Sequence, residues 1–256
     1  RGSIITPLKD RIESQILTHY PTSLDIAKEI TRQEAKFAED QTEQVHISEM
    51  IRNLLERIAF KARESEFVDE KSGVSARLTI SGMENLVSTA ERRALINGEV
   101  SSAVRIMDFW GMIPAITGKV ELVYEGEQEG PYNVALALIG EAIKEEFLEH
   151  FPHPERLSAD EDKDPYGVIR TWFGAGNTID LYNDSSNKEL DDQLTQVAGL
   201  DGLIDGLKID DTERPLYKEF LLHGLAEFNV LTKDFVNSRF SFGDLLADMF
   251  GDGFDD

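Results

Sequence analysis

The residues best suited to chemistry in this sequence are two arginines rather than a nucleophile and a base. Arg11 ends the run Pro-Leu-Lys-Asp-Arg, and Arg77 follows Gly-Val-Ser-Ala. A planar guanidinium matches the oxygens of a phosphate, and beside a γ-phosphate it neutralises charge in the transition state of phosphoryl transfer. For either arginine alone, a solvated surface position is the alternative. Cys is absent and no Ser/His/Asp set can be assembled, so we expect no nucleophilic catalysis within this segment.

The sequence lacks the loop that cradles the phosphates of a nucleotide. Such a loop needs G-x-x-x-x-G-K-[ST], with glycines for a tight anion nest and a Lys for the β- and γ-phosphates. Gly118-Lys119 is followed by Val120, and neither Gly-Lys-Ser nor Gly-Lys-Thr occurs. We therefore expect no cofactor to bind this chain alone.

Two patterns are similar to metal sites but lack essential ligands. Asp-x-Asp-x-Asp at residues 160–164 begins like a calcium loop, but Pro165 stands in the sixth position, where Gly is required. His150 and His153 are separated by Pro152, which breaks the helix that would align them. We therefore expect no metal site.

Both arginines lie in motifs of a known family. Pro-Leu-Lys-Asp-Arg-Ile at residues 7–12 resembles the P-L-x-D-R-F element of AAA+ ATPases of the magnesium-chelatase and MoxR clade. Ser-Gly-Val-Ser-Ala-Arg-Leu at residues 72–78 is similar to the sensor-2 segment of that clade, at the start of a lid helix. The resemblance implies that Arg11 is an arginine finger acting in trans on a neighbour's ATP. It also implies that Arg77 contacts the γ-phosphate from the lid.

The resemblance is specific over residues 1–21 and 46–98 and weaker over 99–151. It implies that a longer parent binds ATP and Mg²⁺ and assembles as a homo-oligomer, a hexameric ring. The function it implies is that of a lid and partner-interaction portion, coupling ATP hydrolysis to remodelling of a partner with a von Willebrand factor A-type domain. Two alternatives stay open. One is the ATPase subunit of magnesium chelatase proper, and the other is a non-catalytic acidic helical interaction module.

Composition excludes several classes of partner. The 256 residues carry 26 Lys and Arg against 49 Asp and Glu, a net charge of −23. This balance repels a phosphate backbone, so we expect no nucleic-acid binding. No apolar run approaches the roughly 20 residues that cross a bilayer, so we expect no membrane span. The absence of cysteine fits the cytoplasm. The acidity serves either solubility or docking of a partner.

Apolar periodicity predicts a mainly α fold. The strongest pattern predicts a helix over residues 47–66, and others predict helices over 24–39 and from Pro131 to 151. A capping box beginning at Ser81 predicts a helix that ends at Asn97-Gly98. Within that helix, Arg92-Arg93 is interpreted as a pair of solvated charges.

Weaker patterns fill the rest of the chain. We expect a helix over residues 100–113, ended by Pro114, and an exposed strand or hairpin arm over 119–125. Ile16-Leu17 reads as the end of a strand that Pro21 stops. Two further helices are expected over residues 190–197 and 216–231.

These elements suggest four regions: residues 1–21 as the end of an α/β ATPase core, 22–155 as a helical lid with a strand insertion, 156–239 as a C-terminal helical region, and 240–256 as an acidic aromatic tail. The tail holds four Phe and five Asp without Lys or Arg. It either forms an amphipathic helix that docks on a basic, apolar groove of a partner, or folds back onto the chain's own core.

Overall fold

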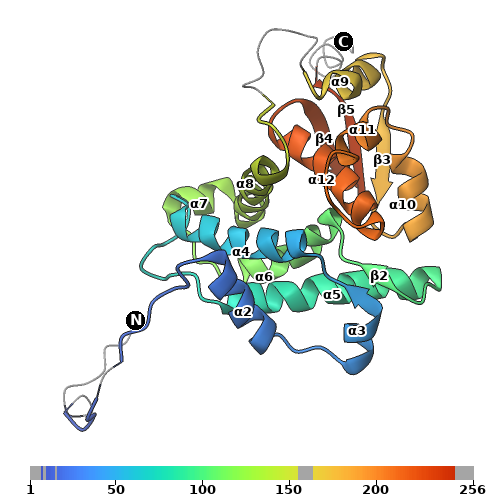
Figure 1. Ribbon diagram of the computed structural model, residues 1–256. Helices are drawn as coiled ribbons and strands as arrows, with labels where there is room; N and C mark the ends of the chain where they lie inside the picture. The colour runs from blue at the N-terminus through green and yellow to red at the C-terminus, as the bar shows by residue number, and fades with distance from the viewer. Residues whose placement is uncertain (1–6, 8–9, 15, 155–163, 246–256) are drawn as a thin grey trace.

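The computed structural model describes residues 7, 10–14, 16–154 and 164–245, and it is mainly helical, with a few short strands (Figure 1). This confirms the predicted fold class. None of the described helices is both long and apolar enough to cross a bilayer.

The first part of the chain forms a helical layer in the lower and middle parts of Figure 1. Its elements are α2 (Leu24–Glu34), α3 (Glu39–Gln44), β1 (Val45–His46), α4 (Glu49–Glu64), α5 (Arg77–Asn97), β2 (Ser102–Ala103), the 3-10 helix η1 (Ile106–Met112), α6 (Ile113–Thr117), α7 (Tyr124–Glu129) and α8 (Pro131–His150). The strands β1 and β2 form a parallel pair that joins Val45 to Ser102.

The rest of the chain combines helices with a small sheet. Its elements are α9 (Gly167–Gly174), β3 (Ile179–Tyr182), α10 (Asn187–Leu194), α11 (Leu200–Ile204), the 3-10 turn η3 (Asp211–Glu213), α12 (Arg214–Glu227), β4 (Leu231–Val236) and β5 (Arg239–Asp244). The antiparallel sheet has the order β3-β5-β4. Asn237 and Ser238 both have positive φ and form the tight turn between β4 and β5.

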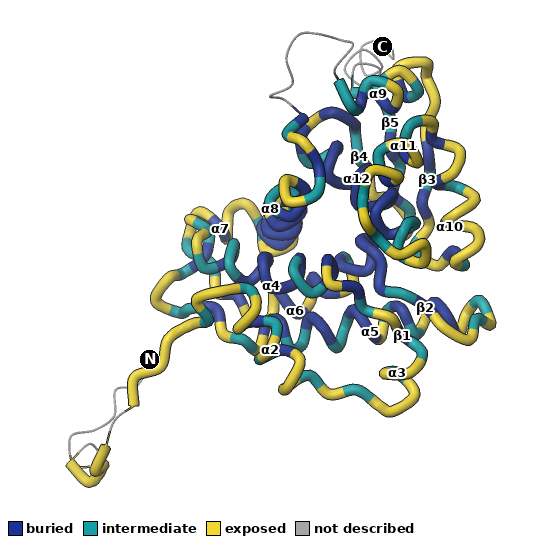
Figure 2. The backbone as a smooth tube through the Cα atoms, viewed as in Figure 1, coloured by how far each residue is buried: buried dark blue, intermediate teal, exposed yellow. Residues whose placement is uncertain are grey.

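One hydrophobic core runs through both parts, because α8 packs against α4 on one side and α12 on the other. Figure 2 shows α8 buried along most of its length. Gly224 of α12 lets the ring of Phe147 approach closely, since a Cβ there would lie 2.0 Å from a ring carbon. On the α4 side, Nε of the buried Arg57 donates to Glu146 at 2.6 Å. The helices predicted over residues 47–66 and 131–151 thus form the centre of the fold.

The predicted start of one helix is wrong. α5 begins at Arg77, so Ser81 lies inside the helix rather than at its cap. The apolar side chain of Leu78 is fully buried, and this packing holds the extra turn in place. The helix ends as predicted, with Gly98 at φ 65°.

The helix predicted over residues 100–113 does not form as one α-helix, because a nearby and a distant carboxylate take its backbone donors. The N–H of Arg105 donates to Asp108 at 2.8 Å, and the N–H groups of Ile106 and Met107 donate to Glu219 of α12 at 3.2 and 2.7 Å. The segment becomes β2 followed by η1, and Pro114 opens α6 instead of ending a helix.

Neither predicted short strand forms among the described residues. Leu122 makes only an isolated bridge to Val68, and α7 then begins at Tyr124. Close packing of Gly126 on the carbonyl of Phe67 favours this turn of helix. Ile16 and Leu17 have no neighbouring strand, and these residues are 86% and 85% exposed.

The C-terminal part differs from the expected helical region by its sheet. Phe240 and Phe242 lie in β5 with both side chains fully buried, so they belong to the core and not to an amphipathic tail helix. The remainder of the tail, residues 246–256, lies outside the described residues.

Arg93 is fully buried, contrary to the interpretation of Arg92-Arg93 as solvated charges. Its guanidinium pairs with the buried Asp108, and donates to Ser102 Oγ at 3.3 Å and to the carbonyl of Ala103 at 2.6 Å. One side chain of α5 therefore fixes both β2 and η1. Arg92, by contrast, is exposed and pairs with Asp184 at 2.6 Å.

We expect Arg93→Met to lower the free energy of unfolding by about 3–5 kcal/mol, because it leaves Asp108 buried without its cation. The neighbouring Arg92→Met removes only an exposed pair and should cost less than about 1 kcal/mol. Urea unfolding of the two variants measures both values. Equal losses would contradict the structural role given to Arg93.

Candidate functional site

Arg77 is the first residue of α5, and its side chain is exposed. The N-cap residue is Ala76, which has no side chain to cap the helix, and the first turn holds no acidic residue. Within the described residues, no ion pair holds the guanidinium. The N–H groups of Arg77 and Leu78 donate to Ser75, to its Oγ at 3.3 Å and its carbonyl at 3.0 Å, so the attraction of an anion to this end of α5 comes from the exposed guanidinium and the helix dipole.

The N-terminal segment packs on the loop that leads to Arg77. The guanidinium carbon of Arg63 lies over the ring of Tyr20, 4.6 Å from the ring centre. Nε of Arg63 donates to the carbonyl of Val74 at 3.1 Å. Gly73, at φ 72°, leaves room for Tyr20, whose hydroxyl would lie 2.1 Å from a Cβ there. The chain that resembles the end of an ATPase core thus meets the predicted sensor segment.

Arg11 lies in an exposed turn of the segment that extends from the helical layer. In the part of the chain that the structure describes, its guanidinium makes no ion pair and has no contact with Arg77. The structure therefore does not bring the two predicted site residues together. A role in trans for Arg11 stays a prediction.

A buried polar cluster supports the first turn of α5 from below. Thr79 shares a hydrogen bond of 2.8 Å with Thr31 of α2, and the Thr31 hydroxyl also donates to Glu56 of α4. Burial raises the pKa of Glu56 above its usual range. The cluster joins three helices immediately behind Arg77. The sequence patterns gave no sign of it, because each residue alone fits a solvated helix face.

The patterns that were rejected as metal sites have other roles where they are described. Asp164 accepts the N–H of Tyr166 at 2.9 Å and pairs with Arg170 at 3.0 Å. His150 lies 3.2 Å from a carboxylate oxygen of Glu146. Residues 160–163 lie outside the described part. Among the described residues, no group of three His, Asp or Glu side chains could hold a metal ion.

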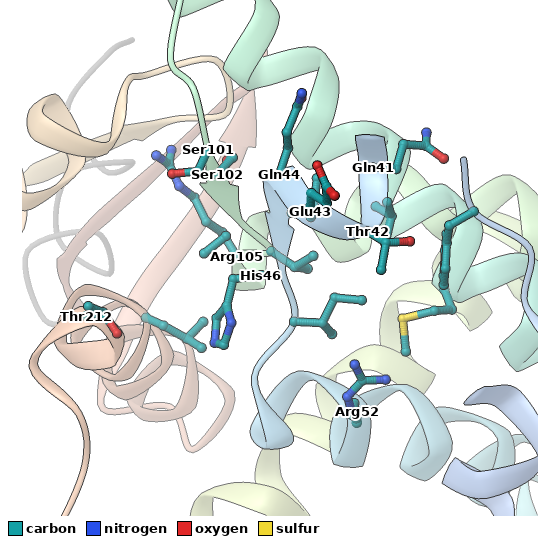
Figure 3. Close-up of a pocket in the computed structure, with 18 of the residues that line it drawn as sticks. Gln41, Thr42, Glu43, Gln44, His46, Arg52, Ser101, Ser102, Arg105 and Thr212 are labelled. Carbon is teal, nitrogen blue, oxygen red and sulfur yellow. The ribbon is translucent and has the colours of Figure 1, made fainter. Parts of the chain in front are cut away.

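The structure contains a second candidate site that sequence patterns did not reveal, a pocket of about 870 Å³. Its walls are residues 41–47 and 101–105, with side chains from α2, α4 and α5 and from the starts of α10 and α12 (Figure 3). We call it the basic pocket, because Arg32, Arg52, Arg105 and His46 line it. Segments from five separate stretches of the sequence form it, so no local motif could have predicted it.

Arg105 forms the inner wall of the basic pocket. Only 3% of this residue is exposed, and its guanidinium donates to the carbonyl of Ser185 at 2.8 Å and to Oδ1 of Asn187 at 3.0 Å. Burial, reinforced by the nearby Arg93, lowers its pKa to about 10. At neutral pH Arg105 is still charged, so the wall is cationic.

Glu219 of α12 lies behind this wall, fully buried, where it accepts the N–H groups of Ile106 and Met107. Complete burial raises the pKa of Glu219 to about 7, although the Met107 N–H and the charge of Arg105 oppose the rise. His223 lies 3.9 Å away, and burial keeps its pKa low.

No protein-family model, no curated protein and no solved structure matches this chain. Its candidate sites therefore rest on the motif resemblance and on the geometry described above.

We expect the stability of the protein to fall as the pH rises from 5 to 8. The folded state holds the proton of Glu219 up to about pH 7, whereas the unfolded state loses it near the ordinary value of 4.5. The contribution of this group is thus present at low pH and lost as the pH rises through 7. Glu219→Gln should remove this part of the slope, on the order of 1–3 kcal/mol in total.

Unfolding in urea at several pH values measures the slope. Glu141→Gln is the matched control, because Glu141 is exposed and pairs with Lys144 on its own helix. If Glu219→Gln and the wild type have the same slope, Glu219 does not titrate as argued.

Proposed function

We propose that this chain is the lid and C-terminal, partner-interacting portion of an oligomeric AAA+ ATPase of the magnesium-chelatase or MoxR-like kind. The parent protein would bind ATP and Mg²⁺, form a homo-oligomeric ring and act in the cytoplasm. Hydrolysis would drive remodelling of a partner protein, for which one with a von Willebrand factor A-type domain is the candidate.

The position of Arg77 carries this proposal. A sensor arginine must stand at the start of a lid helix, exposed and free to reach a phosphate. Arg77 opens α5, and the first turn of this helix has no acidic residue. The chain before the lid also packs, through Tyr20, on the loop that leads to this arginine. These features support a nucleotide-facing side at this end of α5.

The residues of this chain fit only one part of a nucleotide. Arg77 would hold a terminal phosphate oxygen, assisted by the dipole of α5. The backbone nest for the other phosphates and the Mg²⁺ ligands would come from residues of the parent upstream of residue 1. Binding of ATP would then draw Arg77 towards the core and turn the lid as a rigid helical layer.

The gene sequence upstream of residue 1 tests the proposal most directly. An encoded G-x-x-x-x-G-K-[ST] loop after an apolar strand supports the motor. A degenerate loop, or none, overturns the proposal in favour of the acidic interaction module.

In the parent, we expect Arg77→Ala to lower ATP turnover at least about tenfold, because it removes a charge-assisted contact to the phosphate. The melting temperature should stay within about 1 °C of the wild type, because an exposed Arg contributes little to stability. Lys71→Ala, an exposed cation in the same loop, should change neither value. A large loss of thermal stability in Arg77→Ala would mark this residue as structural instead.

We expect Arg11→Ala in the parent to lower turnover by about 10³, with ATP affinity unchanged within a few-fold, because the guanidinium would act on a neighbour's transition state. Arg11→Lys should lower turnover almost as much, since an ammonium lacks the planar fork of a guanidinium. Mixing Arg11→Ala with a phosphate-loop variant should restore part of the turnover through mixed interfaces. Wild-type turnover in Arg11→Ala would disprove the assignment.

A further inference from the structure

Arg52 lines the basic pocket as a cation whose guanidinium has no partner among the described residues. Its side chain is half-buried on α4. Glu43, the one carboxylate in the described lining, lies across the pocket from it (Figure 3). A guanidinium taken partly out of water keeps donors that the protein leaves unused, so an acceptor supplied by a ligand would stabilise it.

The other basic side chains of the pocket already have partners. Arg32 pairs with Glu29 at 2.7 Å, and Nε2 of His46 lies 3.4 Å from a carboxylate oxygen of Glu213. Arg105 is held by the two acceptors described above, at the other end of the pocket from Arg52 (Figure 3). Within the described lining, Arg52 is therefore the cation left for a ligand, and one cation matches a ligand with one negative charge.

The floor of the pocket is apolar, which restricts the ligand further. Its side chains come from the helical layer and from α10 and α12: Phe37, Ile47, Met83, Val87, Leu190 and Leu216. A small inorganic anion would leave this floor without a contact. A ligand that carries an apolar body beside its charged group would cover the floor and reach Arg52 together.

The size of the pocket sets the scale of the ligand. A volume of about 870 Å³ lies in the range of cavities that take small organic molecules, about 300–1,000 Å³. Nucleic acid does not suit it, because the chain has a net charge of −23. A carboxylate suits the head position, because its two oxygens match the planar fork of a guanidinium.

We propose that the basic pocket binds a small monocarboxylate with an extended apolar body. The carboxylate binds to the guanidinium of Arg52, and the apolar body lies on the floor between α5 and the starts of α10 and α12. This inference is independent of the ATPase proposal, because it uses neither Arg11 nor Arg77.

Methyl NMR of the full chain with decanoate as the probe tests the site. Met83 lies in the floor, whereas Met112 does not line the pocket, so ¹³C-methyl labelling of methionine gives a signal inside the site and a reference outside it. Met83→Leu identifies the first signal. We expect a saturable shift of the Met83 methyl with a Kd of about 0.1–1 mM, the affinity expected of so small a ligand.

Two matched probes separate the head of the ligand from its body. 1-Decanol has the same chain without the charge, and we expect it to bind at least about fivefold more weakly than decanoate, because the charge-assisted contact is lost. Acetate has the charge without the chain and should leave the Met83 signal in place at the same concentrations.

Two variants and a control identify the residues. Arg52→Gln should raise the Kd for decanoate at least about fivefold, because it removes the cation. Lys119→Gln, the same charge change at an exposed site outside the pocket, should leave the Kd unchanged. Ala35→Phe, at another wall of the pocket, should raise the Kd at least about fivefold by filling the space of the apolar body, and it decides the matter if Arg52→Gln fails to fold.

Three results would overturn the proposal. One is a Met83 signal that does not shift with decanoate up to several millimolar. Another is a shift of Met112 as large as that of Met83, which marks binding of decanoate outside the pocket. The third is a Kd that is the same for decanoate and 1-decanol and is unchanged in Arg52→Gln and Ala35→Phe.

Discussion

A single buried guanidinium holds the helical layer and its irregular segment together. Arg93 loses its hydration entirely, and the cost is offset only because Asp108, Ser102 and Ala103 all present oxygen atoms to it. Those acceptors belong to β2 and η1. The order of residues 102–112 therefore depends on a side chain of α5, and the β1–β2 pairing depends on that order.

The C-terminal part attaches to the same segment through a second set of polar contacts. Arg105 donates to Ser185 and Asn187, and Glu219 accepts the N–H groups that follow Arg105. Apolar side chains of α8 also pack against α12, but this packing is not directional. Hydrogen bonds to fixed backbone positions set the register. The basic pocket lies where these contacts place its wall.

Helices whose register is set by their own residues could be predicted from the sequence, as Ile51 and Leu54 in α4 and Pro131 at the start of α8 show. Residues 100–113 could not be predicted, because Glu219, which takes their N–H groups, lies more than a hundred positions away. The burial of Arg93 could have been predicted, because it lies seven residues after Leu86 and three after Ala90, on the buried face of α5. Of the sites, the motif of Arg77 was visible in the sequence, and the pocket was not.

The proposed function and the architecture meet in α5. Arg77 opens this helix, and Arg93 lies sixteen residues further along it, a distance of ~24 Å at ~1.5 Å per residue. An uninterrupted helix transmits displacement along its axis without bending, and Arg93 fixes its far part to β2 and η1. If a bound nucleotide pulls Arg77 towards it, the segment that carries the wall of the basic pocket must move with α5. The contacts of Arg105 and Glu219 would pass that movement on to α10 and α12. Coupling between nucleotide state and the C-terminal part thus requires no hinge within α5, only that its two arginines are held at the same time.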